Sequence, residues 1–287
     1  MGIPAGEGFS AQPRALIVTI YGLYARDADG WLSISALIRL MAELGADEPA
    51  VRSATSRLKQ RGLLEPQRRD GTAGYGLTEH GLAILAEGDL RIFQRPRASA
   101  SDGWLLAVFS VPEDQRSRRH ALRSRLAWLG FGSVAAGVWI APAQLAAETR
   151  AVLVADGLAE YVSLFTADYL AFGDVRDQVS RWWDLDRLEQ LYQAFIDAAA
   201  PVLARWAAGR AGSGEDGQAF ADYVRLLTAW RRLPFLDPGL PAEVLPAGWH
   251  GARAAELFAQ LSGLLAVPAR HHVGLVTGGA PTPREDR

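Results

Sequence analysis

The segment from Asp47 to Leu64 reads DEPAVRSATSRLKQRGLL, and the fold expected for the first third of the chain depends on it. Asp47 is a suitable N-cap for a helix, and Pro49 is tolerated in the first turn. Gly62 is expected to end this helix. Small or apolar residues recur at helical spacing and predict one buried stripe, formed by Val51, Ala54, Thr55 and Leu58.

The opposite face of this helix differs from that of an ordinary amphipathic helix, which carries charges of both signs. After Glu48 it carries only positive charge and small hydroxyl or amide groups. Such side chains contact phosphates and base edges in the major groove of DNA, and the alternative is a simply solvated face. The candidate DNA-contacting residues are Arg52, Ser53, Ser56, Arg57, Lys59 and Gln60.

Two further helices are predicted before this one. The first is the apolar stretch Ala15–Arg26, and the second begins after a cap at Ser33 or Ser35 and ends at Gly45. A short strand is expected between them at Trp31–Leu32. The predicted order is that of a helix-turn-helix: two helices, a short turn and then the basic helix.

A hairpin is predicted after the basic helix. Leu63–Pro66 and Tyr75–Thr78 are expected to be extended, and the polar turn between them contains the hairpin signal Asp70-Gly71. A basic-tipped hairpin after a helix-turn-helix predicts a winged helix over residues 1–95. The alternative is a helical domain with an ordinary surface hairpin. The turn adds two candidate DNA-contacting residues, Arg68 and Arg69.

A small, polar linker at Pro96–Gly103 precedes a pattern of strand, helix, strand, strand, helix and strand. This order predicts a ferredoxin-like domain over residues 103–174. The arginine run Arg116–Arg125 is either a solvated face or a surface for an anionic ligand or DNA. The expected elements are Trp104–Val111, Asp114–Leu129, Gly132–Ala136, Val138–Ala141, Pro142–Leu158 and Glu160–Thr166.

The last part of the chain, residues 175–276, is predicted to be a helical domain. A long proline-rich connection, Leu233–Trp249, precedes a last helix at Ala252–Ala266, and His271 and His272 are expected beyond it in a tail. The whole chain is therefore expected to be an α+β protein. It would combine a winged helix-turn-helix, a central ferredoxin-like domain and C-terminal helices.

The composition excludes several classes of protein. The 287 residues are 49% hydrophobic, enough for two or three domains with sizeable cores. A net charge of -2 means that any nucleic-acid surface is local, and the lack of cysteine excludes disulfides. The N-terminus has no signal-peptide pattern, and the glycines within Leu126–Ala147 suit turns between strands better than a membrane span. We therefore expect a cytoplasmic protein.

No strong catalytic motif is present, because the sequence contains neither G-x-S-x-G, nor H-E-x-x-H, nor a Walker lysine signature. The neighbouring histidines His271 and His272 are interpreted as surface residues rather than as a metal site. We therefore expect a protein that is not an enzyme and that needs no cofactor or metal.

Four stretches spread over nearly the whole chain resemble the PaaX family, named for the transcriptional repressor of phenylacetic-acid catabolism. They are RALIVTIYGLYAR with WLSISALIRLMAELG, then EPAVRSATSRLKQRGLL, then WLLAVFSVPEDQRSRRHALRSRLAWLGFGSVAAGVWIAP, and finally WRRLPFLDPGLPAEVLPAGWHGARAAELF. The resemblance implies a homodimeric repressor of a catabolic operon. It also implies that affinity for double-stranded operator DNA drops when an acyl-CoA effector, such as phenylacetyl-CoA, binds.

The effector is expected between the ferredoxin-like domain and the C-terminal helices. Aromatic rings can stack on an adenine or aryl group, and arginines can pair with phosphates. The alternative is that the tryptophans pack helices against one another. The candidate effector-binding residues are Arg116, Arg119, Arg123, Trp182, Trp183, Trp230, Arg231 and Arg232.

The middle domain also resembles the CRISPR-associated Cas2 nuclease fold, in which an aspartate at the end of the first strand supports metal-dependent cleavage. Ser110 is the best match to that position here. Without a carboxylate there, metal-assisted hydrolysis is disfavoured. A Cas2-like metal-dependent nuclease or nucleic-acid-processing enzyme is thus the alternative function, and the repressor is favoured.

Overall fold

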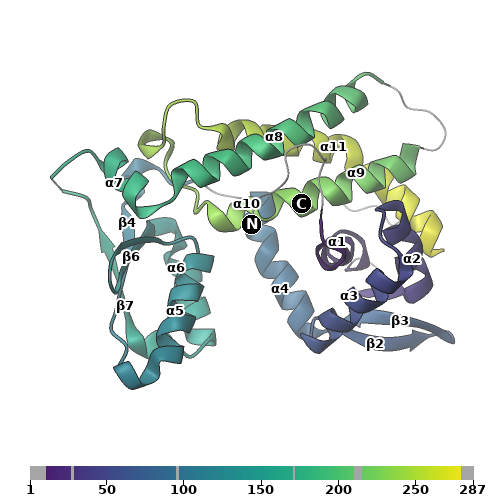
Figure 1. Ribbon diagram of the computed structural model, residues 1–287, viewed down its shortest axis with the longest axis horizontal. Coiled ribbons are helices and arrows are strands. Elements are labelled where there is room, and N and C mark those ends of the chain that lie inside the picture. The colour runs from purple at the N-terminus through teal and green to yellow at the C-terminus, as the bar shows by residue number, and fades with distance from the viewer. Residues whose placement is uncertain (1–10, 27–28, 95–96, 171, 210–214, 279–287) are drawn as a thin grey trace. The chain divides into compact units, whose positions relative to one another are not determined.

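The computed structural model describes residues 11–26, 29–94, 97–170, 172–209 and 215–278. The chain is an α+β protein with two antiparallel sheets, and it forms two compact units (Figure 1). The first unit comprises Met1–Leu90, Ala194–Arg231 and Ala252–Arg287, and the second comprises Arg91–Gln193 and Arg232–Gly251. No helix in the described ranges is both long and apolar enough to cross a membrane.

The N-terminal part of the first unit contains the predicted helices and hairpin. Its three strands pair in the order β1-β3-β2, all antiparallel. The elements are α1 (Pro13–Ile20), the π-helical turn η1 (Tyr21–Ala25), β1 (Trp31–Ser33), α2 (Ile34–Glu43), α3 (Glu48–Gln60), β2 (Leu64–Arg69), β3 (Thr72–Leu77) and α4 (Glu79–Asp89), which the π-helical turn η2 (Leu90–Gln94) follows.

Local side-chain hydrogen bonds begin three of these helices. Ser33 caps α2 by accepting from the Ala36 amide at 3.1 Å, and Asp47 caps α3 by accepting from the Ala50 amide at 2.8 Å. Thr78 accepts from the amide of Gly81 at 2.9 Å at the start of α4. The caps predicted at Asp47 and Thr78 are confirmed, and Ser33 rather than Ser35 caps α2.

The tip of the β2–β3 hairpin depends on two residues in left-handed conformation. Asp70 has φ 47° and Gly71 has φ 77°. Positive φ at both central residues is typical of a type I′ turn, whose twist matches that of the paired strands. The hairpin predicted from Asp70-Gly71 is therefore confirmed, and its strands are longer than expected.

Two long helices from the C-terminal part pack in the first unit: α9 (Glu215–Trp230), which lies against α1, and α11 (His250–Thr277). The hydroxyl groups of Thr19 and Thr228 are 2.7 Å apart, and the buried ring of Trp230 stacks on Phe258. Helix α8 (Leu185–Ala207) contributes residues to both units. The division into three consecutive domains stays a prediction, because the two compact units follow different boundaries.

The last helix is much longer than the predicted Ala252–Ala266. It continues through Pro268 to Thr277, so the placement of His271 and His272 in a tail was wrong. Proline inside a helix removes a hydrogen bond and costs about 3 kcal/mol. The burial of Leu265, Ala269 and Val273 on one face offsets that cost.

The second unit holds a four-stranded antiparallel sheet in the order β5-β6-β4-β7. One face of this sheet packs against two helices, α5 and α6, and the core between them includes Leu105, Leu122, Leu126 and Leu153. The elements are β4 (Trp104–Phe109), α5 (Arg116–Trp128), β5 (Gly132–Ala135), β6 (Val138–Pro142), α6 (Ala146–Ala155) and β7 (Val162–Ala167).

A second core forms at one end of the opposite face of this sheet. Trp104 and Ile140 pack there with Val179, Trp183 and Leu240. Trp104 and Ile140 belong to the sheet, Val179 to α7 (Val175–Trp182), Trp183 to the position directly after α7, and Leu240 to the proline-rich connection. That connection contains α10 (Leu233–Leu236) and a 3-10 turn, η7 (Ala242–Val244). The predicted linker is partly folded, since the Ala98 amide donates to Gly239 at 3.0 Å, whereas Pro96 lies outside the described residues.

Candidate nucleic-acid interface

Helix α3 separates its buried and exposed side chains as the sequence predicts. Val51, Ala54, Thr55 and Leu58 are buried, and the Thr55 hydroxyl donates internally to the Val51 carbonyl at 2.8 Å. The exposed face consists of polar or cationic side chains, namely Arg52, Ser53, Ser56, Arg57, Lys59 and Gln60. The predicted buried stripe is confirmed, and the side chains on the opposite face are exposed to solvent.

The intramolecular contact that Arg52 makes is weak. Its guanidinium pairs with Glu48 at 2.7 Å, and both side chains are more than half exposed. Exposed pairs of this kind contribute about 0–1 kcal/mol and are screened by salt. A phosphate or base edge can therefore replace Glu48 at little cost.

The two arginines of the hairpin differ in how firmly they are held. Arg68 is exposed and donates to the Gly71 carbonyl at 3.1 Å. Arg69 donates to the Asp29 carbonyl at 3.0 Å, and its guanidinium lies 5.4 Å from the ring centroid of Trp31. Arg69 is thus fixed at the base of the turn, whereas Arg68 is the more available cation.

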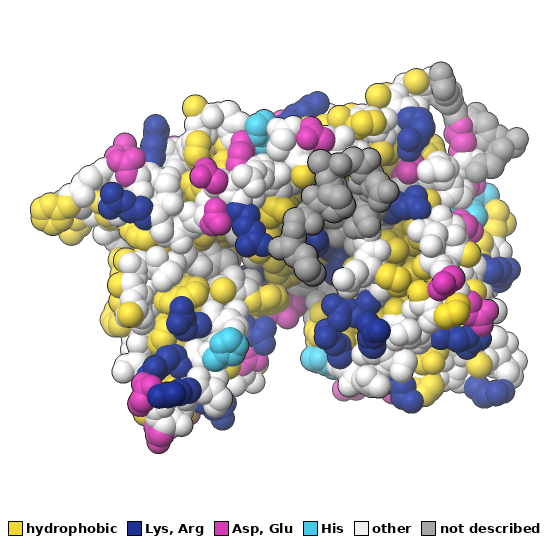
Figure 2. Space-filling view, viewed as in Figure 1, with side chains coloured by type: hydrophobic (Ala, Val, Ile, Leu, Met, Phe, Trp, Pro, Cys, Tyr) yellow, Lys and Arg dark blue, Asp and Glu magenta, His cyan; other side chains and the backbone are white. Residues whose placement is uncertain are grey.

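A shallow groove brings the helix and the hairpin together. Its volume is about 300 Å³, and both Arg52 and Arg68 line it, beside Gln67 and Tyr75. Figure 2 shows Lys and Arg side chains along the face of the first unit where α3 and the β2–β3 hairpin lie. Gln67 and Tyr75 were not among the predicted DNA-contacting residues, because their side chains join the groove only once β2 and β3 pair.

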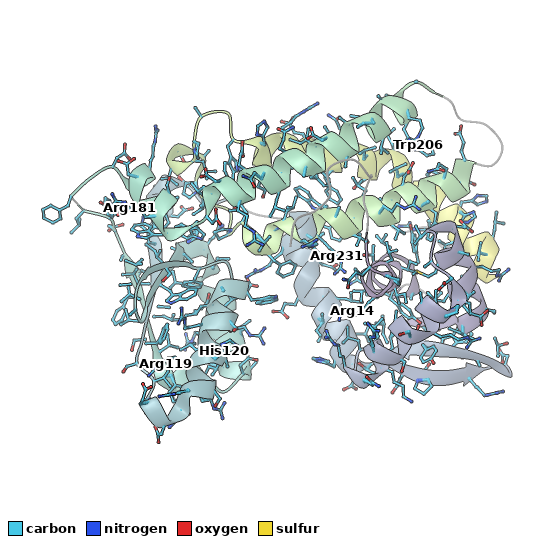
Figure 3. The ribbon with its side chains drawn as sticks, in the orientation of Figure 1. Arg14, Arg119, His120, Arg181, Trp206 and Arg231 are labelled. Atoms are coloured by element: carbon cyan, nitrogen blue, oxygen red, sulfur yellow. The ribbon has the colours of Figure 1, made fainter. Side chains whose placement is uncertain are left out.

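The candidate effector-binding residues are divided between the two units. Trp230 and Arg231 belong to the first unit, and Arg231 donates to the Ala15 carbonyl at 3.3 Å (Figure 3). Arg232, which is exposed, belongs to the second unit, as do Arg116, Arg119, Arg123, Trp182 and Trp183.

The three tryptophans all pack in hydrophobic cores. Trp183 is buried and donates its indole N–H to the Gly130 carbonyl at 2.9 Å. Trp182 meets Trp104 edge-on at 5.9 Å between ring centroids. Trp230 is 2% exposed and stacks on Phe258 at 4.7 Å. Their effector role stays a prediction, and packing already accounts for each ring.

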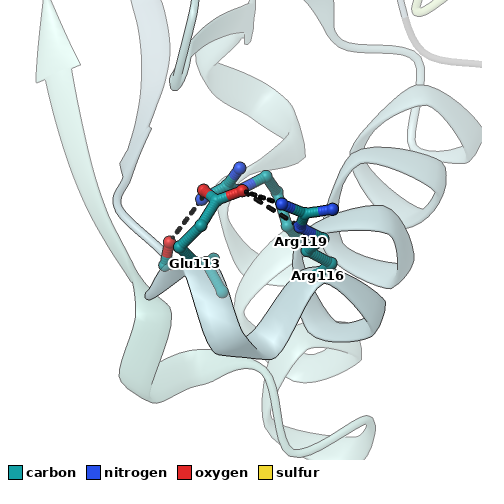
Figure 4. A network of polar contacts seen from close by, with 4 residues as sticks. Glu113, Arg116 and Arg119 are labelled. Atoms are coloured by element: carbon teal, nitrogen blue, oxygen red, sulfur yellow. Dashed lines mark hydrogen bonds and ion pairs between the residues drawn. The ribbon is translucent and has the colours of Figure 1, made fainter.

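The arginines on α5 are not equivalent. Arg116 and Arg119 both pair with Glu113 at 3.0 Å (Figure 4). Arg125 pairs with Asp156 at 2.5 Å and lies over the Trp128 ring. Arg123 is exposed and makes no hydrogen bond or ion pair with any described residue.

Ser110 follows directly after β4, where the nuclease alternative requires a carboxylate. Within the described ranges, no group of three His, Asp or Glu side chains is arranged to hold a metal ion. The Tyr161 hydroxyl nearby donates to Gln115 at 2.7 Å, and desolvation raises the pKa of this tyrosine.

Comparison with known proteins agrees with a regulatory role. Three family models match in succession: PaaX-like protein over residues 12–81, PaaX protein central Cas2-like domain over residues 97–179, and PaaX-like protein C-terminal domain over residues 183–274. The transcriptional repressor PaaX of Escherichia coli strain K12 is 29% identical over 248 residues, which are 85% of this chain and 77% of the relative.

A solved structure is also similar. Protein Rv0674 from Mycobacterium tuberculosis matches with a TM-score of 0.53 and 26% identity, over 88% of this chain and 96% of that one. Taken together, these findings support a transcriptional regulator. The chain belongs to the PaaX family.

Proposed function

We propose that the protein is a DNA-binding transcriptional repressor that reads its operator through a winged helix-turn-helix. In this proposal α2 and α3 are the helix-turn-helix, and the β2–β3 hairpin is the wing. The observation that carries it is the exposed face of α3, which presents cations and hydroxyls, with Arg52 and Arg68 lining one groove. The repressor named among the relatives supports the same function.

In this proposal α3 contacts the DNA bases, and the wing contacts the sugar-phosphate backbone or the minor groove. Arg52, Ser56 and Arg57 face the major groove, where arginine pairs bidentately with guanine. Arg68 and Arg69 touch phosphate or the minor groove. Since the whole chain carries a net charge of -2, binding depends on this local surface and on salt.

The operator is a pseudo-palindrome read by a homodimer. One recognition helix supplies only a few base contacts, and dimeric helix-turn-helix proteins place half-sites about one helical turn apart or multiples of it. The dimer contacts involve residues after Thr78. A monomeric mass at micromolar concentration with unaltered operator binding would refute the dimer.

The repressor controls a catabolic operon in the cytoplasm and is released by an acyl-CoA such as phenylacetyl-CoA. The second unit, with its strand order β5-β6-β4-β7, serves as a ferredoxin-like domain for regulation rather than as an enzyme. An effector releases DNA only if it binds the DNA-incompetent arrangement more tightly. A preference of about 10⁴-fold swings a two-state equilibrium almost completely.

Gel-shift titration on DNA from upstream of the gene tests the DNA-binding role. Wild type is expected to shift a discrete fragment, and the Arg52→Ala, Arg57→Ala double variant to lose about 1–3 kcal/mol for each base-reading arginine. Arg150→Ala is a matched control, because Arg150 is an exposed arginine on α6. Normal affinity in the double variant would contradict the assignment of α3.

The effector is tested separately by adding acyl-CoAs and free aromatic acids to the preformed complex. Release of the fragment by an acyl-CoA is expected. If none of these compounds releases DNA at millimolar concentration, this effector class is wrong and the repressor assignment still stands.

A further inference from the structure

A groove of about 440 Å³ opens in the second unit, where the end of β4 meets α5 and the β5–β6 hairpin. The less exposed part of its lining is apolar, with Val111 and Trp139 buried and Phe109 half-buried. Ser110, Ser133 and Arg123 are exposed and bring polar groups to the same groove. Small-molecule sites have volumes of about 300–1,000 Å³ and combine an apolar lining with a few polar groups.

Two arginines on one face of α5 enter this groove. Arg119 and Arg123 are four residues apart, which places them one helical turn from each other. One terminal nitrogen of Arg119, Nη2, donates to the Val111 carbonyl at 2.7 Å and to Glu113 at 3.0 Å (Figure 4). Those bonds hold the guanidinium in place, while its other N–H groups have no partner among the described residues.

Arg123 has no counter-charge. It makes no hydrogen bond or ion pair with a described residue, although it lines the groove. The groove lining contains Arg119 and Arg123 and no carboxylate, and Glu113 outside the lining pairs with Arg119. An uncompensated guanidinium beside another one favours an anionic ligand.

The strand side of the groove contains an irregularity in the pairing of β5 with β6. The pairing of β5 with β6 shifts register between Ser133 and Ala135, which leaves an extra residue in β5. Such bulges are common next to binding sites, because they redirect a side chain. Gly137 closes the hairpin with φ 77°, and its carbonyl accepts from the Phe109 amide at 2.8 Å.

We propose that this groove binds a small organic anion. A phosphate or carboxylate group accepts hydrogen bonds from Arg119, Arg123 and the hydroxyls of Ser110 and Ser133. An apolar or aromatic body attached to that group covers Phe109 and Trp139. The lining holds two arginines and no carboxylate, which favours an anion over a cation as the occupant.

The site lies entirely within the second unit. If the protein is an effector-responsive repressor, this groove is where the anionic effector binds. Only the effect of the ligand on DNA binding rests on that proposed function. Anion binding itself is a property of this unit and can be measured without DNA.

Isothermal titration of the 287-residue protein with phenyl phosphate, phenylacetate, inorganic phosphate and benzyl alcohol tests the site. An aromatic anion is expected to bind more tightly than inorganic phosphate, and neutral benzyl alcohol is expected not to bind. The better of phenyl phosphate and phenylacetate identifies the anionic group. Arg123→Ala is expected to weaken binding by about tenfold or more, as loss of a charge-assisted hydrogen bond does.

Two further variants separate the groove from general charge. Ser133→Ala should weaken binding, whereas Arg118→Ala removes the same charge from α5 at a residue that lines a different groove. Equal weakening by Arg118→Ala and Arg123→Ala, or no change in Arg123→Ala and Ser133→Ala, would overturn the site. Circular dichroism of each variant shows whether it is folded.

Operator binding without any anion is measured on the same proteins. Wild type that binds operator DNA but none of the anions at millimolar concentration overturns this inference and leaves the repressor assignment intact. Wild type that binds an aromatic anion through Arg123 but no operator DNA supports the site and contradicts the proposed function.

Discussion

Individual residues in the first unit differ in how well their buried polar atoms are satisfied. The hydroxyl of Tyr21 donates to the Tyr75 carbonyl at 3.0 Å, whereas the buried hydroxyl of Tyr24 has no hydrogen-bond partner among the described residues. Both rings lie in the π-helical turn η1 and pack in the core. A buried donor without a partner costs about 1–3 kcal/mol.

The two tyrosines form a matched pair for mutation. Tyr24→Phe removes the unsatisfied hydroxyl, keeps the ring against Phe220, and is expected to raise the free energy of unfolding by about 1 kcal/mol. Tyr21→Phe removes the hydrogen bond to the Tyr75 carbonyl and is expected to lower the free energy of unfolding by about 1 kcal/mol. Urea denaturation measures both, and destabilisation by Tyr24→Phe would show that its hydroxyl is satisfied.

The same tyrosines predict loss of stability in alkali. Burial raises the pKa of Tyr21 and of Tyr24 above the ordinary tyrosine value. In the unfolded chain these groups lose protons near pH 10, so above that pH the folded state binds more protons and the free energy of unfolding falls. The stabilising contribution of the two protonated hydroxyls to the free energy of unfolding is complete below about pH 10. It is lost as the pH rises towards the pKa values of these tyrosines in the folded state. Denaturation curves between pH 8 and about 11 check this, and Tyr24→Phe should flatten the decline.

Among the elements, α3 depends on its own cap and on core contacts. Asp47→Ala removes the acceptor for the Ala50 amide and is expected to lower the free energy of unfolding by about 1 kcal/mol. Asp47→Ser should restore most of that loss, since serine is also a good cap. Thermal denaturation measures the series, and equal stability of the alanine variant would show that core packing alone fixes the start of the helix.

The hairpin is expected to act on DNA through charge rather than through base reading. Arg68→Ala should lower operator affinity and unrelated DNA affinity alike, and reduce the slope of log K against log salt by about 1. Arg52→Ala should instead reduce discrimination between operator and unrelated DNA. Fluorescence anisotropy over a range of salt concentrations compares them, and an unchanged salt slope in Arg68→Ala would remove the wing from the interface.

At the scale of the whole molecule, the N-terminal elements are predicted to need the last helix. Truncation after Trp249 removes α11, whose Leu257, Leu261 and Leu265 are buried. Each buried leucine contributes about 1.5–3 kcal/mol, and whole domains are stable by only about 5–15 kcal/mol. The truncated protein should therefore lose cooperative unfolding and operator binding.

Circular dichroism and limited proteolysis test this truncation. A shorter truncation that removes only residues 279–287 keeps α11 and should behave as wild type. Cooperative unfolding and normal operator affinity after the longer truncation would instead support an independent domain over residues 1–95.

The local elements of this protein follow from short-range sequence signals. The cap at Asp47, the spacing of Val51 and Leu58, and the turn at Asp70-Gly71 act within a few residues, so their effect can be read along the chain. The exposed cations of α3 follow from the same helical period. The element order of the second unit was predictable for the same reason.

Which helix and strand faces meet depends on long-range packing and cannot be read along the chain. Helical period marks a buried stripe but does not name its partner, so the packing of α9 on α1 and the continuation of α11 through Pro268 were not predictable. The groove that joins Ser110, Arg123 and Ser133 likewise needs three elements brought together. Burial is a property of contacts between distant segments, and for that reason Trp230 is identified as a core residue only in the folded chain.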